Sequence, residues 1–133
     1  MNEENIRSYN VGSSDYSKHR IQPWDLWEYI FDGWRCDIVK RLLRTKEGDI
    51  RLMDYQKVRH IIMKILELLD KGFRFFPNRP IPEGLLVSVM EKYNLKHDEC
   101  LILSKIMEED TNNPKPVRQC LVLIDRLIED EQV

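Results

Sequence analysis

DYQKVRHIIMKILELLDKG, residues 54–72, carries the periodicity of an α-helix with one wide apolar face. Its apolar side chains recur at spacings of three and four, which places them on the same side of the helix. They are Tyr55, Val58, Ile61, Ile62, Ile65, Leu66 and Leu69. Asp54 is a suitable N-terminal cap, and Gly72 after Lys71 is a typical C-terminal stop. The segment therefore predicts a long amphipathic helix that buries most of one face.

A second helical pattern precedes this helix, over residues 24–42. Its apolar positions, which include all three tryptophans of the chain, are also three or four apart. Gly33 interrupts the pattern, because glycine in a helix costs about 1 kcal/mol relative to alanine. We therefore expect a short helix over 24–32 and a second over 35–45, which pairs with the long helix as a helical hairpin.

Three further helices are expected after the hairpin, over 82–93, 97–109 and 113–130. The connection before them, 73–81, contains three phenylalanines that we expect to be largely buried, namely Phe73, Phe75 and Phe76. No segment shows a convincing strand alternation. The chain therefore predicts an all-α fold of five or six helices, in which an N-terminal basic helical hairpin packs with a C-terminal helical group.

The 133 residues fit one domain, or one domain with an appendage. Residues 1–15 are polar and predict a flexible N-terminal arm. Residues 16–72 hold the basic hairpin. Residues 73–133 form the C-terminal helical part, whose wide apolar faces also suit an oligomer contact. We expect a homo-oligomer, because small helical proteins often build a shared pocket.

Several classes of protein are disfavoured by composition. No apolar run approaches the roughly 18–20 residues of a membrane span, and the first residues lack the features of a signal peptide. We therefore expect a cytoplasmic protein with no membrane partner. The three cysteines and three histidines are widely spaced, unlike those of a disulfide framework or a zinc site. We expect neither a metal site nor a resident cofactor.

Charge is distributed unevenly along the chain. Residues 35–64 contain nine Lys or Arg and four acids, whereas residues 95–133 contain five Lys or Arg and nine acids. The formal net charge of the whole chain is −2. A local basic zone in a mildly acidic protein indicates a small anionic ligand, because long nucleic acid needs a larger basic footprint.

The basic zone contains a candidate phosphate site. Lys40 and Arg44 are four residues apart and so share a helix face. If the two hairpin helices are antiparallel, this face can converge with Lys57 and His60 of the long helix. Arginine can hold a phosphate through two parallel hydrogen bonds, and lysine as a point charge. The same spacing also fits a solvated charged face with acidic side chains as loose partners, including Asp54.

Aromatic side chains near the hairpin also have two interpretations. Tyr16 can anchor the N-terminal arm or hydrogen-bond a ligand, and Trp24 can pack in the core or stack on a base. We expect two of the three tryptophans to lie in the core. The usual catalytic motifs, including the phosphate-binding loop GxxxxGK[ST], are missing from the sequence. We therefore assign no catalytic residue and favour binding over enzymatic activity.

The order of several short motifs resembles a known family. The motifs are Tyr16, Ile21-Gln22-Pro23-Trp24-Asp25, Lys40, Arg44, the turn Lys46-Glu47-Gly48-Asp49, and Asp54-Tyr55-Gln56-Lys57. Together they resemble the pattern of the SaV-like small phage helical proteins, the family of a coliphage early nucleotide kinase without a Walker loop. The resemblance covers residues 16–69. Cys36-Asp37 stands where the family has Gly-Asn, Arg41 replaces a tyrosine, and Val58 replaces an alanine.

The resemblance implies a nucleotide ligand. Taken together with the helical spacing of the basic side chains, it gives as ligand-binding residues Tyr16, Trp24, Lys40, Arg44, Lys57 and His60. One implied function is a phage protein that sequesters a nucleotide, such as a cyclic or ADP-ribose-type immune signal, as an anti-defence protein. Another is a nucleoside monophosphate kinase, the one case in which Mg²⁺ is a possible cofactor. A helical protein–protein interaction module with an acidic partner is a third interpretation.

Overall fold

The computed structural model describes residues 21–44 and 51–132. Over these ranges the chain forms α2 (Pro23–Trp27), α3 (Gly33–Leu42), α4 (Arg51–Asp70), α5 (Glu83–Lys92), α6 (His97–Ile106) and α7 (Pro114–Gln132). No strand occurs in the described ranges, which confirms the predicted all-α fold. The predictions for residues 1–15, for Tyr16 and for the turn at 46–49 concern residues outside these ranges.

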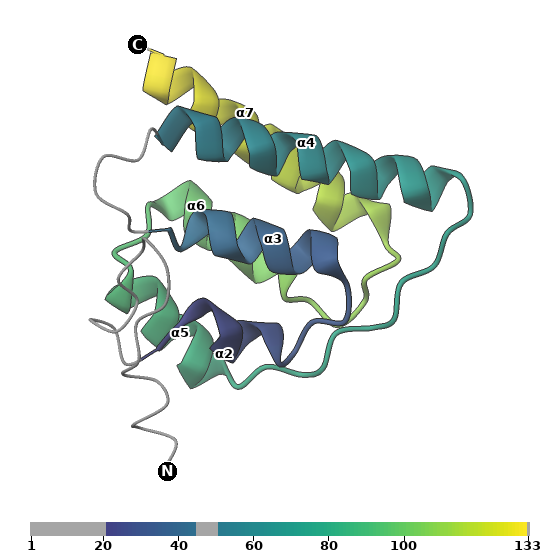
Figure 1. The fold of residues 1–133 in the computed structure, drawn as a ribbon, viewed down its shortest axis with the longest axis horizontal. Coiled ribbons are helices and arrows are strands. Elements are labelled where there is room, and N and C mark those ends of the chain that lie inside the picture. Colours follow the sequence, from purple (N-terminus) through teal and green to yellow (C-terminus); the bar gives the residue numbers. More distant parts are fainter. Residues whose placement is uncertain (1–20, 45–50, 133) are drawn as a thin grey trace.

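The predicted hairpin consists of α3 and α4, which run antiparallel and pack against each other (Figure 1). α7 packs along α4, and α6 packs against both α7 and α3. The hairpin therefore lies on a C-terminal helical group, as the sequence predicts. None of the helices in the described ranges is long and apolar enough to cross a membrane.

One continuous core joins these helices, built from the apolar faces that the sequence pattern indicates. Its fully buried large side chains include Leu26, Ile38, Leu42, Tyr55, Ile62, Ile65, Ile102 and Ile124. Each such aliphatic side chain contributes roughly 1.5–3 kcal/mol when it leaves water. Trp27 and Trp34 are partly buried against this core, whereas Trp24 on α2 is 40% exposed.

The ends of the hairpin helices follow local rules. Asp32 caps α3, because its carboxylate accepts the Arg35 N–H at 2.7 Å. Asp54 is not the cap of α4, as the sequence suggested, because the helix begins three residues earlier at Arg51. The Asp54 side chain is instead buried, with 4% of its surface exposed. Its carboxylate therefore belongs to the interior of the hairpin.

Gly72 ends α4 as predicted. Its φ of +89° allows the Gly72 N–H to donate to the Leu69 carbonyl at 3.1 Å and the Phe73 N–H to donate to the Leu68 carbonyl at 2.9 Å. These two bonds form a Schellman motif, which satisfies the last carbonyls of the helix.

Replacement of Gly72 tests this C-terminal stop. Gly72→Ala should lower the free energy of unfolding by about 1–2 kcal/mol, because an L-residue is strained at positive φ. Crowding is not the cause, since an added Cβ would meet no atom within 4 Å. Gly84, inside α5, has the same free space without a positive φ. Gly84→Ala should therefore leave urea unfolding unchanged or stabilise the protein, and equal destabilisation by both substitutions would contradict the assignment.

The connection between α4 and α5 corrects another prediction. Phe75 is buried, but Phe73 is 45% exposed and Phe76 is 78% exposed. The connection runs without helix over 73–82, so its side chains do not all point to one side. The Asn112 side chain holds the backbone of the buried Phe75 in place, because it accepts the Phe75 N–H at 2.7 Å and donates to the Phe75 carbonyl at 3.0 Å. The predicted burial of Phe73 and Phe76 is therefore wrong.

Candidate functional site

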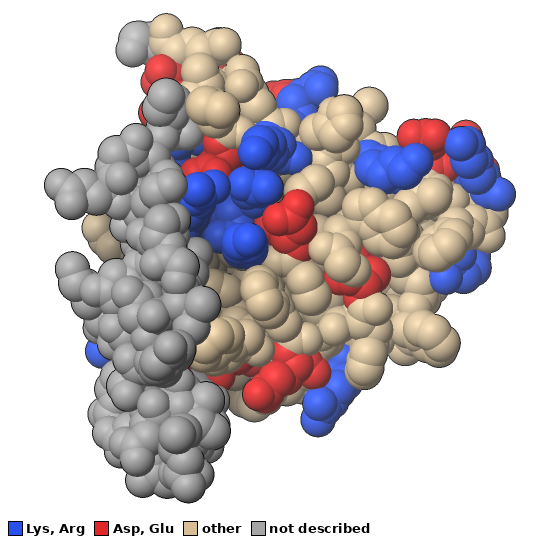
Figure 2. Space-filling view, in the orientation of Figure 1, with Lys and Arg blue, Asp and Glu red and all other residues tan. Residues whose placement is uncertain are grey.

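Lys and Arg side chains gather over the C-terminal half of α3 and the N-terminal half of α4 (Figure 2). Three of them approach the buried Asp54 carboxylate. The closest guanidinium nitrogens of Arg41, Arg44 and Arg51 lie 3.9, 3.5 and 3.4 Å from its oxygens. A single carboxylate therefore sits among three guanidinium groups, one from α3, one from the residues just after it and one from α4.

Arg51 has a structural role in this cluster. It donates to the carbonyls of Arg41 and Leu42, each at 2.8 Å, and so caps the C-terminus of α3. It also forms an ion pair with Glu99 on α6, and its guanidinium lies 4.9 Å from the centre of the Tyr55 ring. Arg51 thereby ties α3, α4 and α6 together.

Glu99 completes this interior network, with only 3% of its surface exposed. Its carboxylate accepts the Tyr55 hydroxyl at 3.0 Å and the Lys96 N–H at 2.8 Å. Burial and the Glu99 charge raise the pKa of Tyr55 to about 12. Burial alone would lower the pKa of Arg51, but its hydrogen bond and attraction to Glu99 outweigh this and raise it. The network therefore stabilises the charged guanidinium and the protonated phenol.

Arg41 is held less tightly than Arg51. Its contact with Asp54 is 3.9 Å, and its contact with Asp37 is 3.4 Å. Strong charge-assisted hydrogen bonds are about 2.7–2.9 Å long. In this structure the buried pair of Arg35 and Asp32 has that length, at 2.9 Å. The guanidinium of Arg41 can therefore turn toward an incoming anion at a smaller cost than a tightly paired arginine.

A groove of about 440 Å³ lies beside this cluster, between α3 and α4. Its lining residues are Asp37 and Arg41 from α3, and Met53, Gln56, Lys57, His60 and Ile61 from α4. The α4 residues are three or four apart and so occupy one helix face. The groove thus combines basic groups, one acid, an amide and two apolar side chains.

The structure brings some of the predicted ligand-binding residues together. Lys57 and His60 line the groove, where they meet Arg41 rather than Lys40. Lys40 is exposed on α3 and is not among the lining residues, and Arg44 belongs to the Asp54 cluster. Helical spacing explains the difference, because Asp37 and Arg41 share the face toward α4 and Lys40 is turned by about 100° from Arg41. The i,i+4 pair of Asp37 and Arg41 was the sequence signal for this face.

Of the two aromatic candidates, Trp24 lies on α2 and is not among the lining residues. The other, Tyr16, is outside the described residues. Within 21–44 and 51–132, no group of three His, Cys, Asp or Glu side chains is placed to hold a metal ion. Comparison of the chain with protein-family models, with curated proteins and with solved structures gives no match. The resemblance to the SaV-like family therefore stays a prediction.

Proposed function

We propose that the groove between α3 and α4 binds a small phosphorylated ligand that carries a flat ring, as a nucleotide does. The observation that carries this proposal is the meeting of Arg41 from one helix with Lys57 and His60 from the other in a single groove. A volume of about 440 Å³ is in the range of sites for one small molecule.

The phosphate end of the ligand is assigned to Arg41 and Lys57. Arginine supplies two parallel N–H donors to phosphate oxygens, and the lysine ammonium adds a second positive charge. The negative charge of Asp37 disfavours a highly charged anion beside Arg41 and Lys57. Its carboxylate is, however, a good acceptor for a sugar hydroxyl. These groups together favour a sugar phosphate over a bare polyanion.

The ring end of the ligand is assigned to Met53 and Ile61. Met53 is exposed and Ile61 is partly buried, so both offer apolar surface to a ligand. The thioether of methionine also makes favourable contacts with aromatic rings. The Gln56 amide has donors and an acceptor, which suit the edge of a base. A ring would therefore gain both contact and hydrogen bonds here.

Binding without turnover is the preferred activity, and we propose sequestration as the role. A nucleotide kinase needs two nucleotides in line and, in general, Mg²⁺. The groove accommodates one small ligand, and sequestration requires no catalytic group. The family resemblance leads us to place this role in a phage-infected cell, where the ligand would be a nucleotide immune signal. The expected homo-oligomer stays a prediction, which light scattering at working concentration checks.

Charge-removing substitutions in the groove test the proposal. Arg41→Gln and Lys57→Gln should each weaken the best ligand about 10- to 100-fold, since a hydrogen bond to a charged group is worth about 1.5–3 kcal/mol. The ligand is found by thermal-shift screening against mononucleotides and cyclic dinucleotides, and its affinity is measured by calorimetry. Arg59→Gln is the matched control, because Arg59 is on the same helix but pairs with Asp125 of α7 at 2.7 Å.

Four outcomes decide whether the groove is the site and whether it only binds. Weakening by the two groove substitutions but not by the control supports the site. No thermal shift with any nucleotide, or equal weakening by Arg59→Gln, overturns it. Conversion of an added non-adenosine monophosphate to its own diphosphate, with ATP as the phosphoryl donor, would replace sequestration with the kinase.

A further inference from the structure

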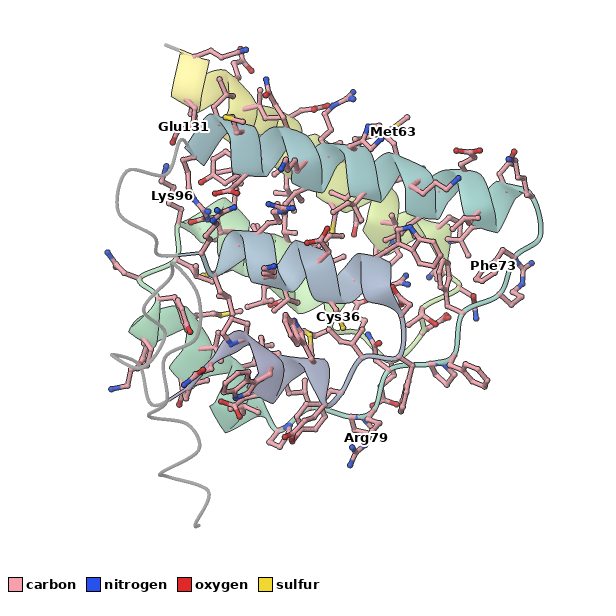
Figure 3. The ribbon with its side chains drawn as sticks, viewed as in Figure 1. Cys36, Met63, Phe73, Arg79, Lys96 and Glu131 are labelled. Atoms are coloured by element: carbon pink, nitrogen blue, oxygen red, sulfur yellow. The ribbon has the colours of Figure 1, made fainter. Side chains whose placement is uncertain are left out.

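A second cavity lies at the other end of α4. It has a volume of about 450 Å³, is open to solvent on one side, and is lined by the last turns of α4, the segment after it and the start of α7. Figure 3 shows Phe73, the residue before Arg74, at the end of the molecule opposite to Lys96 and Glu131. The residues of this cavity do not overlap with those of the groove between α3 and α4.

Two arginines from separate segments face this cavity. Arg74 follows α4, and Arg118 lies in the second turn of α7. Arg74 donates one hydrogen bond to the carbonyl of Phe73 at 3.0 Å, which leaves most of its donors for other groups. Asp70 is the acid of the lining. Within the described ranges, none of these three side chains forms a salt bridge, so the lining carries two positive charges and one negative charge without internal pairing.

Although α7 begins beside the cavity, the hydrogen-bond donors that line the cavity belong to side chains and not to the backbone of the first helical turn. Pro114 and Pro116 have no N–H, and the N–H of Lys115 donates to the Asn113 side chain at 3.1 Å. The first turn of α7 therefore offers few backbone donors to a ligand. Asn112 lines the cavity as well, and its two hydrogen bonds to Phe75 fix the orientation of its amide.

The remaining wall is apolar and consists of Leu66, Leu69 and Pro114. We infer that this cavity binds a small monocarboxylate with an apolar tail, whose carboxylate is held by Arg74 and Arg118. Two guanidinium groups match the two oxygens of a carboxylate. The Asp70 charge disfavours a second negative charge on the ligand, and the leucine side chains favour an aliphatic chain.

Titration of the full chain with acetate, butanoate and hexanoate tests this inference, with backbone amide shifts recorded by NMR. Affinity should rise along the series by up to about fourfold for each methylene that is buried. The largest shifts should occur at Asn112 and Arg118. Equal affinity for all three acids, or shifts centred elsewhere, would overturn the inference.

Two exposed positions give the matched variants. Arg118→Gln should weaken hexanoate at least tenfold, whereas Lys115→Gln, which removes a positive charge from the preceding turn of the same helix but outside the lining, should have no effect. Asp70→Asn should raise the affinity for hexanoate several-fold and allow inorganic phosphate to bind. If Asp70 only stabilised the fold, its replacement would not increase binding. Equal effects of Arg118→Gln and Lys115→Gln would show that only general charge attraction operates. Nucleotide binding in the groove should be unchanged by all three, so the two proposals fail independently.

Discussion

Glu99→Ala should lower the free energy of unfolding by about 3–5 kcal/mol, a large part of the stability of a domain of this size. The substitution removes the closer carboxylate partner of the partly buried Arg51 guanidinium and leaves it only the longer contact with Asp54 at 3.4 Å. It also removes the acceptor of the Tyr55 hydroxyl and of the Lys96 N–H. Urea unfolding followed by circular dichroism measures the loss.

The neighbouring acid provides the control for this prediction. Asp98 is also in the first turn of α6, but it pairs at 3.0 Å with Arg126, whose side chain is exposed. Asp98→Ala should cost less than about 1 kcal/mol, because an ion pair that solvent reaches contributes little. A similar small cost for Glu99→Ala would show that the interior network is not required.

A double substitution separates charge pairing from packing. Glu99→Leu combined with Arg51→Met removes both charges and keeps apolar volume, so it should be more stable than Glu99→Leu alone. Recovery should be incomplete, because Arg51 also caps the carbonyls of Arg41 and Leu42. If the double variant is less stable than the single one, Arg51 acts chiefly as a helix cap.

The helices could be predicted from the sequence because their signals are local. Apolar spacing located α4, and the glycine at position 72 located its end. The interior network could not be predicted in the same way. Arg51 and Glu99 are 48 residues apart, and their pairing depends on how α4 meets α6. A charged residue in the first turn of a helix is ordinarily solvated, so nothing in the sequence distinguished Glu99 from Asp98.

The candidate site could also be predicted only in part from the sequence, although its residues are closer together along the chain. The charge balance of residues 35–64 indicated the basic hairpin, and antiparallel packing placed Lys57 and His60 on its groove. Whether Lys40 or Arg41 lines the groove depends on how α3 is rotated about its own axis. That rotation is set by the burial of Ile38 and Leu42 in the core. Asp54 also had two possible roles, cap or partner, and only the start of α4 at Arg51 separates them.

Alkaline pH should destabilise the protein steeply between about pH 9 and pH 12. Burial raises the pKa of the Cys120 thiol from its ordinary value of 9.0 to about 12, and burial and Glu99 raise that of Tyr55 from 10.0 to about 12. The folded protein therefore keeps protons that the unfolded chain loses. The stability linked to each group is fully present below its unfolded pKa and is lost as the pH rises through the folded value.

The size of this effect follows from the two shifts. Each group contributes a slope of up to about 1.4 kcal/mol per pH unit, and the two together amount to several kcal/mol by pH 12. Cys120→Ala removes one titrating group, so the free energy of unfolding should fall less steeply with pH from about 9 to 12. Any cavity left by the sulfur lowers stability equally at all pH values and does not change the slope. Urea unfolding at a series of pH values measures how the free energy of unfolding changes with pH in the unchanged protein and in Cys120→Ala. Identical slopes would contradict the assignment of Cys120 as a buried, protonated thiol whose ionisation destabilises the core.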